Sequence, residues 1–83
     1  MKITVRYFAS IREAIGQGSE AVETAAPTLG ALRDELIARG GAHASSLARG
    51  RAVRMALNQT LSDESATLAD GAEVAFFPPV TGG

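Results

Sequence analysis

The sequence of 83 residues contains no cysteine, no tryptophan and a single histidine. The lack of cysteine excludes disulfides, thiolate metal ligands and cysteine nucleophiles. The single histidine excludes a metal site built from histidines alone. No apolar run approaches the roughly 20 residues of a membrane span, and the opening MKITVRYF alternates in polarity, unlike a signal peptide. We therefore predict a cytoplasmic protein with no metal site and no membrane contact.

An excess of charge of one sign is also lacking, because 8 Lys and Arg oppose 9 Asp and Glu. The sequence therefore gives no general electrostatic reason to expect nucleic acid as a partner. Arg49, Arg51 and Arg54 in LARGRAVR form a local basic cluster. We interpret this cluster as part of a solvated loop and strand edge, which is favoured over a nucleic-acid patch by roughly three to one. A docking site for an acidic partner stays open as a third interpretation. For His43 we favour a surface or capping role over catalysis.

Alternating polarity predicts the strands. Residues 2–8, KITVRYF, place Ile3, Val5 and Tyr7 on one face and Phe8 on the other. Further strands are predicted at residues 19–25, 52–57, 60–61 and 73–77, with a tight turn at Asn58-Gln59.

A main helix is predicted between Thr28, which can cap its start, and Gly40-Gly41. Gly30 is expected to cost this helix about 1 kcal/mol relative to alanine. Its apolar stripe consists of Leu29, Leu32, Leu36 and Ile37, opposite Arg33 and Asp34. A short helix at residues 9–15 is expected to be capped by Ser10, and residues 43–49 to form another helical turn.

The order β-β-α-β-β-β predicts an α+β fold of the β-grasp type, a mixed sheet with one main helix packed on one face. Residues 1–83 are predicted to form one domain, with a flexible tail at residues 78–83. One helix cannot cover both faces of the sheet, so the other face is expected to stay partly open.

Aromatic residues are predicted on that open face. In the last strand Val74 and Phe76 share one face, so that Phe77 falls on the other, beside Phe8 and near Leu61. A half-buried satellite cluster would explain this arrangement, but a contiguous apolar patch more often marks a partner surface.

The sequence given ends in FFPPVTGG. Pro78 and Pro79 stiffen the exit from the sheet, while Gly82 and Gly83 have no β-carbon and can enter a narrow channel. The six residues from Pro78 reach about 20 Å when extended. A carboxylate with a pKa near 3.5 is ionised and is a poor electrophile, so it requires activation, best as an acyl-adenylate. In a chain without cysteine, sulfur is expected to be carried only as a C-terminal thiocarboxylate.

Three segments together carry a family resemblance: DGAEVAFFPPVTGG at 70–83, MALNQTL at 55–61 and YFASIRE at 7–13. They resemble the small, sulfur-carrier subunits of molybdopterin synthases, which have a ubiquitin-like β-grasp fold. The resemblance implies that an adenylyltransferase related to ubiquitin-activating enzymes uses ATP to adenylate Gly83, which then becomes a thiocarboxylate. It also implies that the sulfur passes to cyclic pyranopterin monophosphate, which forms molybdopterin for the molybdenum cofactor.

The resemblance also implies how the chain is used. Catalytic residues would belong to a large subunit, so the chain is not an enzyme by itself and binds no cofactor beyond the transient adenylate and 1-thioglycine. Two small and two large chains would form a heterotetramer. The tail implied to enter the large subunit is Pro78, Pro79, Val80, Thr81 and Gly82, and the implied contacts are Phe8, Leu61 and Phe77.

Two alternatives stay open from the residues alone. Gly82-Gly83 also fits a carrier for another sulfur pathway, such as thiazole formation or tRNA thiolation. It fits equally a modifier that is joined to lysines through an isopeptide bond. The FFPPV before the glycines favours the molybdopterin pathway.

Overall fold

The computed structural model describes residues 1–79, which form a five-stranded sheet and three helices. The strands are β1 (Lys2–Tyr7), β2 (Ser19–Glu23), β3 (Arg54–Leu57), β4 (Thr60–Ser62) and β5 (Glu73–Phe77). The helices are α1 (Ala9–Ile15), α2 (Leu29–Ala38) and α3 (Gly41–Leu47).

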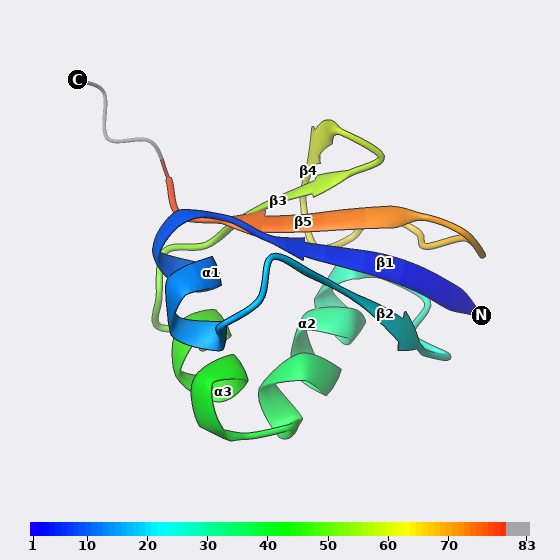
Figure 1. The fold of residues 1–83 in the computed structure, drawn as a ribbon. Helices are drawn as coiled ribbons and strands as arrows, with labels where there is room; N and C mark the ends of the chain where they lie inside the picture. Colours follow the sequence, from blue (N-terminus) through cyan, green and yellow to red (C-terminus); the bar gives the residue numbers. More distant parts are fainter. Residues whose placement is uncertain (80–83) are drawn as a thin grey trace.

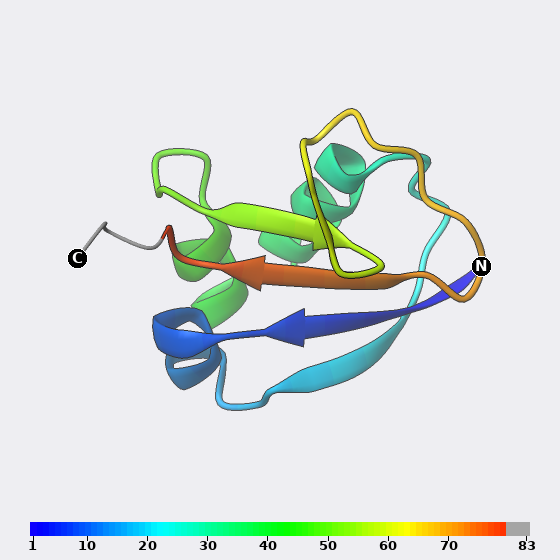
Figure 2. The ribbon, with the colours of Figure 1, turned by 90° about the horizontal axis from the view of Figure 1, so that it is seen from above.

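The strands lie in the order β2-β1-β5-β3-β4. The central pair, β1 and β5, is parallel, and the other neighbouring pairs are antiparallel. All three helices lie on one side of the sheet, and no helix of residues 1–79 lies on the other side (Figures 1 and 2). The predicted α+β, ubiquitin-like β-grasp fold is confirmed, with α1 and α3 on the same side as the main helix α2.

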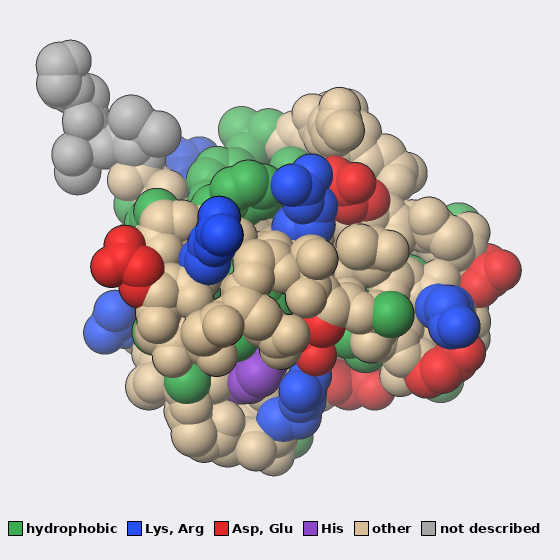
Figure 3. All heavy atoms as spheres, in the orientation of Figure 1, with side chains coloured by type: hydrophobic (Ala, Val, Ile, Leu, Met, Phe, Trp, Pro, Cys, Tyr) green, Lys and Arg blue, Asp and Glu red, His purple; other side chains and the backbone are tan. Residues whose placement is uncertain are grey.

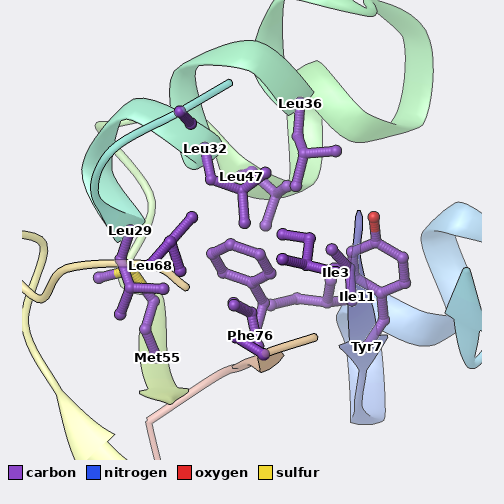
Figure 4. Packing of buried hydrophobic residues seen from close by; sticks show 14 residues of the cluster. Ile3, Tyr7, Ile11, Leu29, Leu32, Leu36, Leu47, Met55, Leu68 and Phe76 are labelled. Atoms are coloured by element: carbon purple, nitrogen blue, oxygen red, sulfur yellow. The ribbon is translucent and has the colours of Figure 1, made fainter. Parts of the chain in front are cut away.

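The core lies between the sheet and the helices. The inward-facing side chains of the two central strands are at most 1% exposed and comprise Ile3, Val5, Tyr7, Val74 and Phe76. The helices cover them with Leu29, Leu32, Leu36 and Leu47, around the ring of Phe76 (Figure 4). Each fully buried side chain of this size contributes about 1.5–3 kcal/mol, so alternation in β1 and β5 fixes which face of the sheet is buried.

The start of α1 differs from the expectation. Phe8 is the residue before the first helical turn, and no side chain caps it. The predicted cap, Ser10, lies inside the helix, because the chain passes from β1 into α1 through Ala9 with a φ of 51°. The predicted cap of α2 is confirmed, since the hydroxyl of Thr28 accepts a hydrogen bond from the Ala31 N–H.

The prediction that Arg33 lies opposite the buried stripe of α2 is wrong, because Arg33 is itself buried. Its side chain is buried and donates from Nε to the Leu47 carbonyl at 2.7 Å and from Nη2 to the Ala48 carbonyl at 2.9 Å. Its Nη1 lies 3.4 Å from a carboxylate oxygen of Glu64. Burial, and then the charge of Arg49, lower the pKa of Arg33, against the opposing effect of Asp34. Arg33 thus holds the segment after α3 against α2.

The start of α2 packs tightly against residues 64–66. The Leu29 N–H donates to the Ala66 carbonyl and the Gly30 N–H to the Glu64 carbonyl, both at 3.0 Å. A β-carbon on Gly30 would lie 2.9 Å from Oε1 and 3.2 Å from the backbone oxygen of Glu64. The absence of a side chain at Gly30 therefore permits this approach.

Replacing Gly30 by alanine is expected to lower the free energy of unfolding by about 1 to 2 kcal/mol. The steric cost of the added methyl group exceeds the gain of about 1 kcal/mol in helix propensity. Chemical denaturation measures the difference. Gly50→Ala is the matched control, because its new β-carbon would meet no atom within 4 Å. Equal or higher stability of the Gly30→Ala protein would contradict this packing argument.

Candidate functional site

The uncovered face of the sheet carries the aromatic residues predicted there. The Phe8 N–H donates to the Phe76 carbonyl at 3.1 Å, so Phe8 continues β1 alongside the end of β5. Tyr7 is the parallel partner of Phe76, which places Phe8 beside Phe77. The side chain of Phe76 is 0% exposed, whereas that of Phe8 is 39% exposed. The predicted division of Phe76 and Phe77 between the two faces is confirmed.

Two small residues connect these aromatics to Leu61. Ala75 of β5 pairs with Ala56 of β3, and Ala56 pairs with Leu61 of β4. Leu61 is 63% exposed. The resulting open-face patch consists of Phe8, Ala56, Leu61, Ala75 and Phe77. In Figure 3, hydrophobic side chains gather on the upper surface, over the sheet and beside the β3–β4 hairpin.

Two arginines flank the open-face patch. Arg6 pairs with Ala75, and its Cζ lies 5.3 Å from the centre of the Phe8 ring. Arg54 pairs with Phe77 and is exposed. Alternation places Arg6 on the same face as Phe8, so the sequence did contain the signal for this flank.

The predicted arginine cluster does not form one surface. Arg49 turns toward α2 and binds Asp34 at 2.8 Å, the Gly30 carbonyl at 3.1 Å and the carboxylate of Glu64. Arg54 instead lies on the open face. The cluster therefore does not act as a continuous basic patch, and Arg49 has a structural role.

His43 is half-buried on the helix side and takes part in a polar network. Its Nε2 lies 2.9 Å from a carboxylate oxygen of Glu20. The same carboxylate accepts a hydrogen bond from the Tyr7 hydroxyl at 2.6 Å and one from Arg39 at 2.9 Å. The network joins β1, β2, α3 and the end of α2. This assigns His43 a packing role instead of the expected surface or capping role.

Glu20 is held in its ionised form by this network. Burial raises the pKa of Glu20, but hydrogen bonds from Tyr7, His43 and Arg39, with the charge of Arg39, outweigh it and lower the pKa from 4.5 to about 2. Burial, followed by the hydrogen bond and charge of Glu20, raises the pKa of the Tyr7 hydroxyl far above its ordinary value, with Arg39 opposing. Tyr7 therefore remains a donor at neutral pH.

Replacing Glu20 by glutamine is expected to cost about 2 kcal/mol of stability at pH 7, because hydrogen bonds to a charged acceptor are lost. The pKa of Glu20 is lower in the folded state, so its stabilisation is complete above about pH 4.5 and is lost as pH falls toward 2. Chemical denaturation between about pH 4.5 and 2 should show a smaller loss of unfolding free energy in the variant than in the wild type. Glu23→Gln, on the same strand but 72% exposed, is the control. Parallel pH profiles of the Glu20→Gln variant and the wild type would contradict this role.

Pro78 and Pro79 follow β5 directly and are half-buried. Neither has a backbone N–H, so the ladder of the sheet ends at Phe77. The other predicted tail residues, Val80, Thr81, Gly82 and Gly83, lie outside the described residues. The roles predicted for the tail and for Phe8, Leu61 and Phe77 as partner contacts stay predictions.

The described part of the chain offers little side-chain chemistry. Within residues 1–79, no three acidic or histidine side chains are close enough to hold a metal ion. Among the helices of the same residues, none has the length and apolarity needed to cross a membrane. The open face has an apolar centre, with Arg6 and Arg54 at its flanks.

Comparison with known proteins places this geometry in a family. The ThiS family matches residues 5–83. The chain is similar to the molybdopterin synthase sulfur carrier subunit of Escherichia coli strain K12, with 44% identity over 81 residues that cover 98% of this chain and 99% of that protein.

Two solved structures share the fold. One is a chain in the complex of subunits 1 and 2 of the molybdopterin-converting factor from Helicobacter pylori. Its TM-score is 0.71 and its identity 27%, and the match covers 100% of this chain and 100% of that chain. The other is SAMP1 from Haloferax volcanii, with a TM-score of 0.78, 25% identity and full coverage of both chains.

Proposed function

The chain belongs to the ThiS family, and we propose that it is the sulfur-carrier subunit of a molybdopterin synthase. The observation that carries this proposal is the 44% identity, over nearly the full length of both chains, with a protein of that name. The open-face patch and the FFPPVTGG segment are where the function is expected to reside.

The carboxylate of Gly83 is the proposed sulfur carrier. An activating adenylyltransferase joins this carboxylate to the α-phosphate of ATP, and pyrophosphate leaves. Hydrosulfide, or a donor that delivers sulfur at the same oxidation level, then attacks the acyl carbon, AMP leaves with the bonding electron pair and the S–H proton is released, so the product is a thiocarboxylate. The chain has no cysteine to hold sulfur in another way, which supports this assignment. The adenylation step consumes ATP, which favours the cytoplasm as the compartment of this protein.

The large subunit is the proposed site of catalysis. The tail of Pro78, Pro79, Val80, Thr81 and Gly82 brings the sulfur of Gly83 to cyclic pyranopterin monophosphate, and this chain supplies no catalytic side chain. Two sulfurs complete the dithiolene, so each product consumes two carriers. A complex of two small and two large chains would serve both transfers.

The open-face patch is the proposed docking surface for the large subunit. Phe8, Leu61 and Phe77 are exposed or half-buried, although they are apolar. The Helicobacter pylori neighbour was solved as a complex of subunits 1 and 2, which supports a partner of this kind. The patch also adjoins Pro78, so docking here places the tail against the same partner.

Intact-mass analysis tests the proposal. Protein isolated from cells with a working sulfur-transfer pathway is expected to contain a fraction heavier by the difference between one sulfur and one oxygen. Fragmentation should place the added sulfur at Gly83. A Gly83 deletion variant is the control and should show no such fraction. Sulfur at any other residue would contradict the carrier mechanism.

A second candidate is a protein modifier, which the similarity to SAMP1 of Haloferax volcanii favours. SAMP1 belongs to the small archaeal modifier proteins by its name. In that case Gly83 would be recovered in peptides joined to lysine side chains of other proteins. The same mass analysis therefore separates the two candidates.

A further inference from the structure

The open-face patch has a guanidinium on each of two sides. Arg6 lies on β1 and Arg54 on β3, with β5 between them. Arg6 pairs with Ala75 and Arg54 pairs with Phe77, so the two arginines are offset by two residues along β5. From the spacing of strands, their Cα atoms are about 12 Å apart. Two positive charges therefore border one apolar surface.

Arg54 has no ion pair or side-chain hydrogen bond within residues 1–79. Asp63 and Glu64 line the same open groove as Arg54. However, Asp63 accepts hydrogen bonds from the backbone and hydroxyl of Ser65, and Glu64 binds Arg33 and Arg49. The neighbouring carboxylates are thus engaged elsewhere.

Arg6 is only loosely paired. Its Nη1 lies 3.8 Å from a carboxylate oxygen of Glu73, with the two side chains 44% and 32% exposed. A pair of this length and exposure contributes little to stability. Its contact with the Phe8 ring holds the guanidinium at the surface of the patch. Arg6 can therefore pair with an external carboxylate without cost to the fold.

A partner that covers the patch also removes water from both guanidiniums. A buried charge without a partner is costly, whereas a guanidinium and a carboxylate can form two parallel hydrogen bonds. A purely apolar partner surface would leave Arg6 and Arg54 unpaired.

We propose that Arg6 and Arg54 select the partner of this face: the large subunit presents one carboxylate to each guanidinium around an apolar centre. This inference rests on the proposed function and adds the chemistry of the partner surface. The apolar patch supplies most of the affinity, and the two charge pairs supply the discrimination between partners and a faster association.

The test measures the dissociation constant of the full chain with the purified large subunit of the same organism, at low and at high salt. Arg6→Gln and Arg54→Gln are each expected to weaken binding about tenfold at low salt. The double variant is expected to lose about a hundredfold, because the sites are far enough apart to act independently. High salt should reduce the difference from the wild type.

Lys2→Gln is the matched control. It removes the same charge from the same face of β1, about 13 Å from Arg6, and is expected to change affinity less than about twofold. Melting temperatures should differ little among all four variants, since the replaced side chains are exposed.

Four outcomes would overturn the inference. A double variant that binds the large subunit as well as the wild type would show that no carboxylates face the arginines. The proposed function would stand in that case, because the unmodified chain still binds the large subunit. An equal loss in Lys2→Gln would show that only net charge matters. Unchanged binding to the large subunit with lost binding to the adenylyltransferase would assign the pair to a different partner. Absence of wild-type binding to the large subunit would overturn the proposed function as well.

Discussion

Extending the chain by one alanine after Gly83 is expected to abolish sulfur delivery, with a loss of at least about a hundredfold in rate. The reacting carbon must lie within about 3 to 3.5 Å of its target, and one added residue moves it by about the same distance. The alanine also adds a methyl group where a channel wide enough only for glycine is expected. Thermal stability and binding to the large subunit should hardly change, because the core is formed by residues up to Phe76.

The assay for this variant is sulfuration of the pterin by chemically prepared thiocarboxylate. This preparation bypasses the activating enzyme and measures the transfer step alone. Deletion of Gly83 should have the same effect, and the wild-type thiocarboxylate prepared in the same way is the control. Substantial turnover by the extended carrier would mean that tail length does not position the sulfur.

Replacing Phe77 by aspartate is expected to weaken binding to the large subunit by a factor of thirty or more. Central interface aromatics commonly contribute about 2 kcal/mol or more, which corresponds to roughly thirtyfold in affinity. The fold should persist, because the Phe77 side chain lies on the face away from the helices, whereas Phe76 fills the core. Phe77→Leu retains an apolar side chain and should keep most of the affinity.

Titration calorimetry gives the affinities of both Phe77 variants, and thermal unfolding reports on the fold. An unfolded Phe77→Asp protein would mean that Phe77 contributes to the core. A folded variant with wild-type affinity would instead exclude the open-face patch as the docking surface.

The sheet could be predicted from the sequence because each strand has a local signal. A period of two separates Ile3, Val5 and Tyr7 from Phe8, and the same rule divides Phe76 from Phe77. Burial then follows the alternation, since a shift by one residue would expose the whole apolar set. The open-face aromatics were predictable for this reason, although their role as contacts stays a prediction.

The side chains that the sequence misassigned depend on distant partners. Arg33 lies on the flank of α2, and its burial is possible only because carbonyls of Leu47 and Ala48 accept its hydrogen bonds. By helix propensity alone, Gly30 is unfavourable in α2. A glycine fits this position because Glu64 approaches too closely to leave room for a β-carbon. No local pattern indicates contacts across 14 or more residues. Val80 to Gly83 lie outside the described residues, so the tail rests on sequence alone.

The place of β5 between β1 and β3 has a consequence for biosynthesis. A ribosome makes β1 first, yet the central parallel pair cannot close before residues 73–77 have left the exit tunnel. Such long-range pairing makes folding slow compared with that of helical proteins of similar size. A prematurely terminated chain without β5 has neither Phe77 nor a completed sheet, so it lacks the proposed docking surface. Only a chain translated through its last strand can display the complete open-face patch.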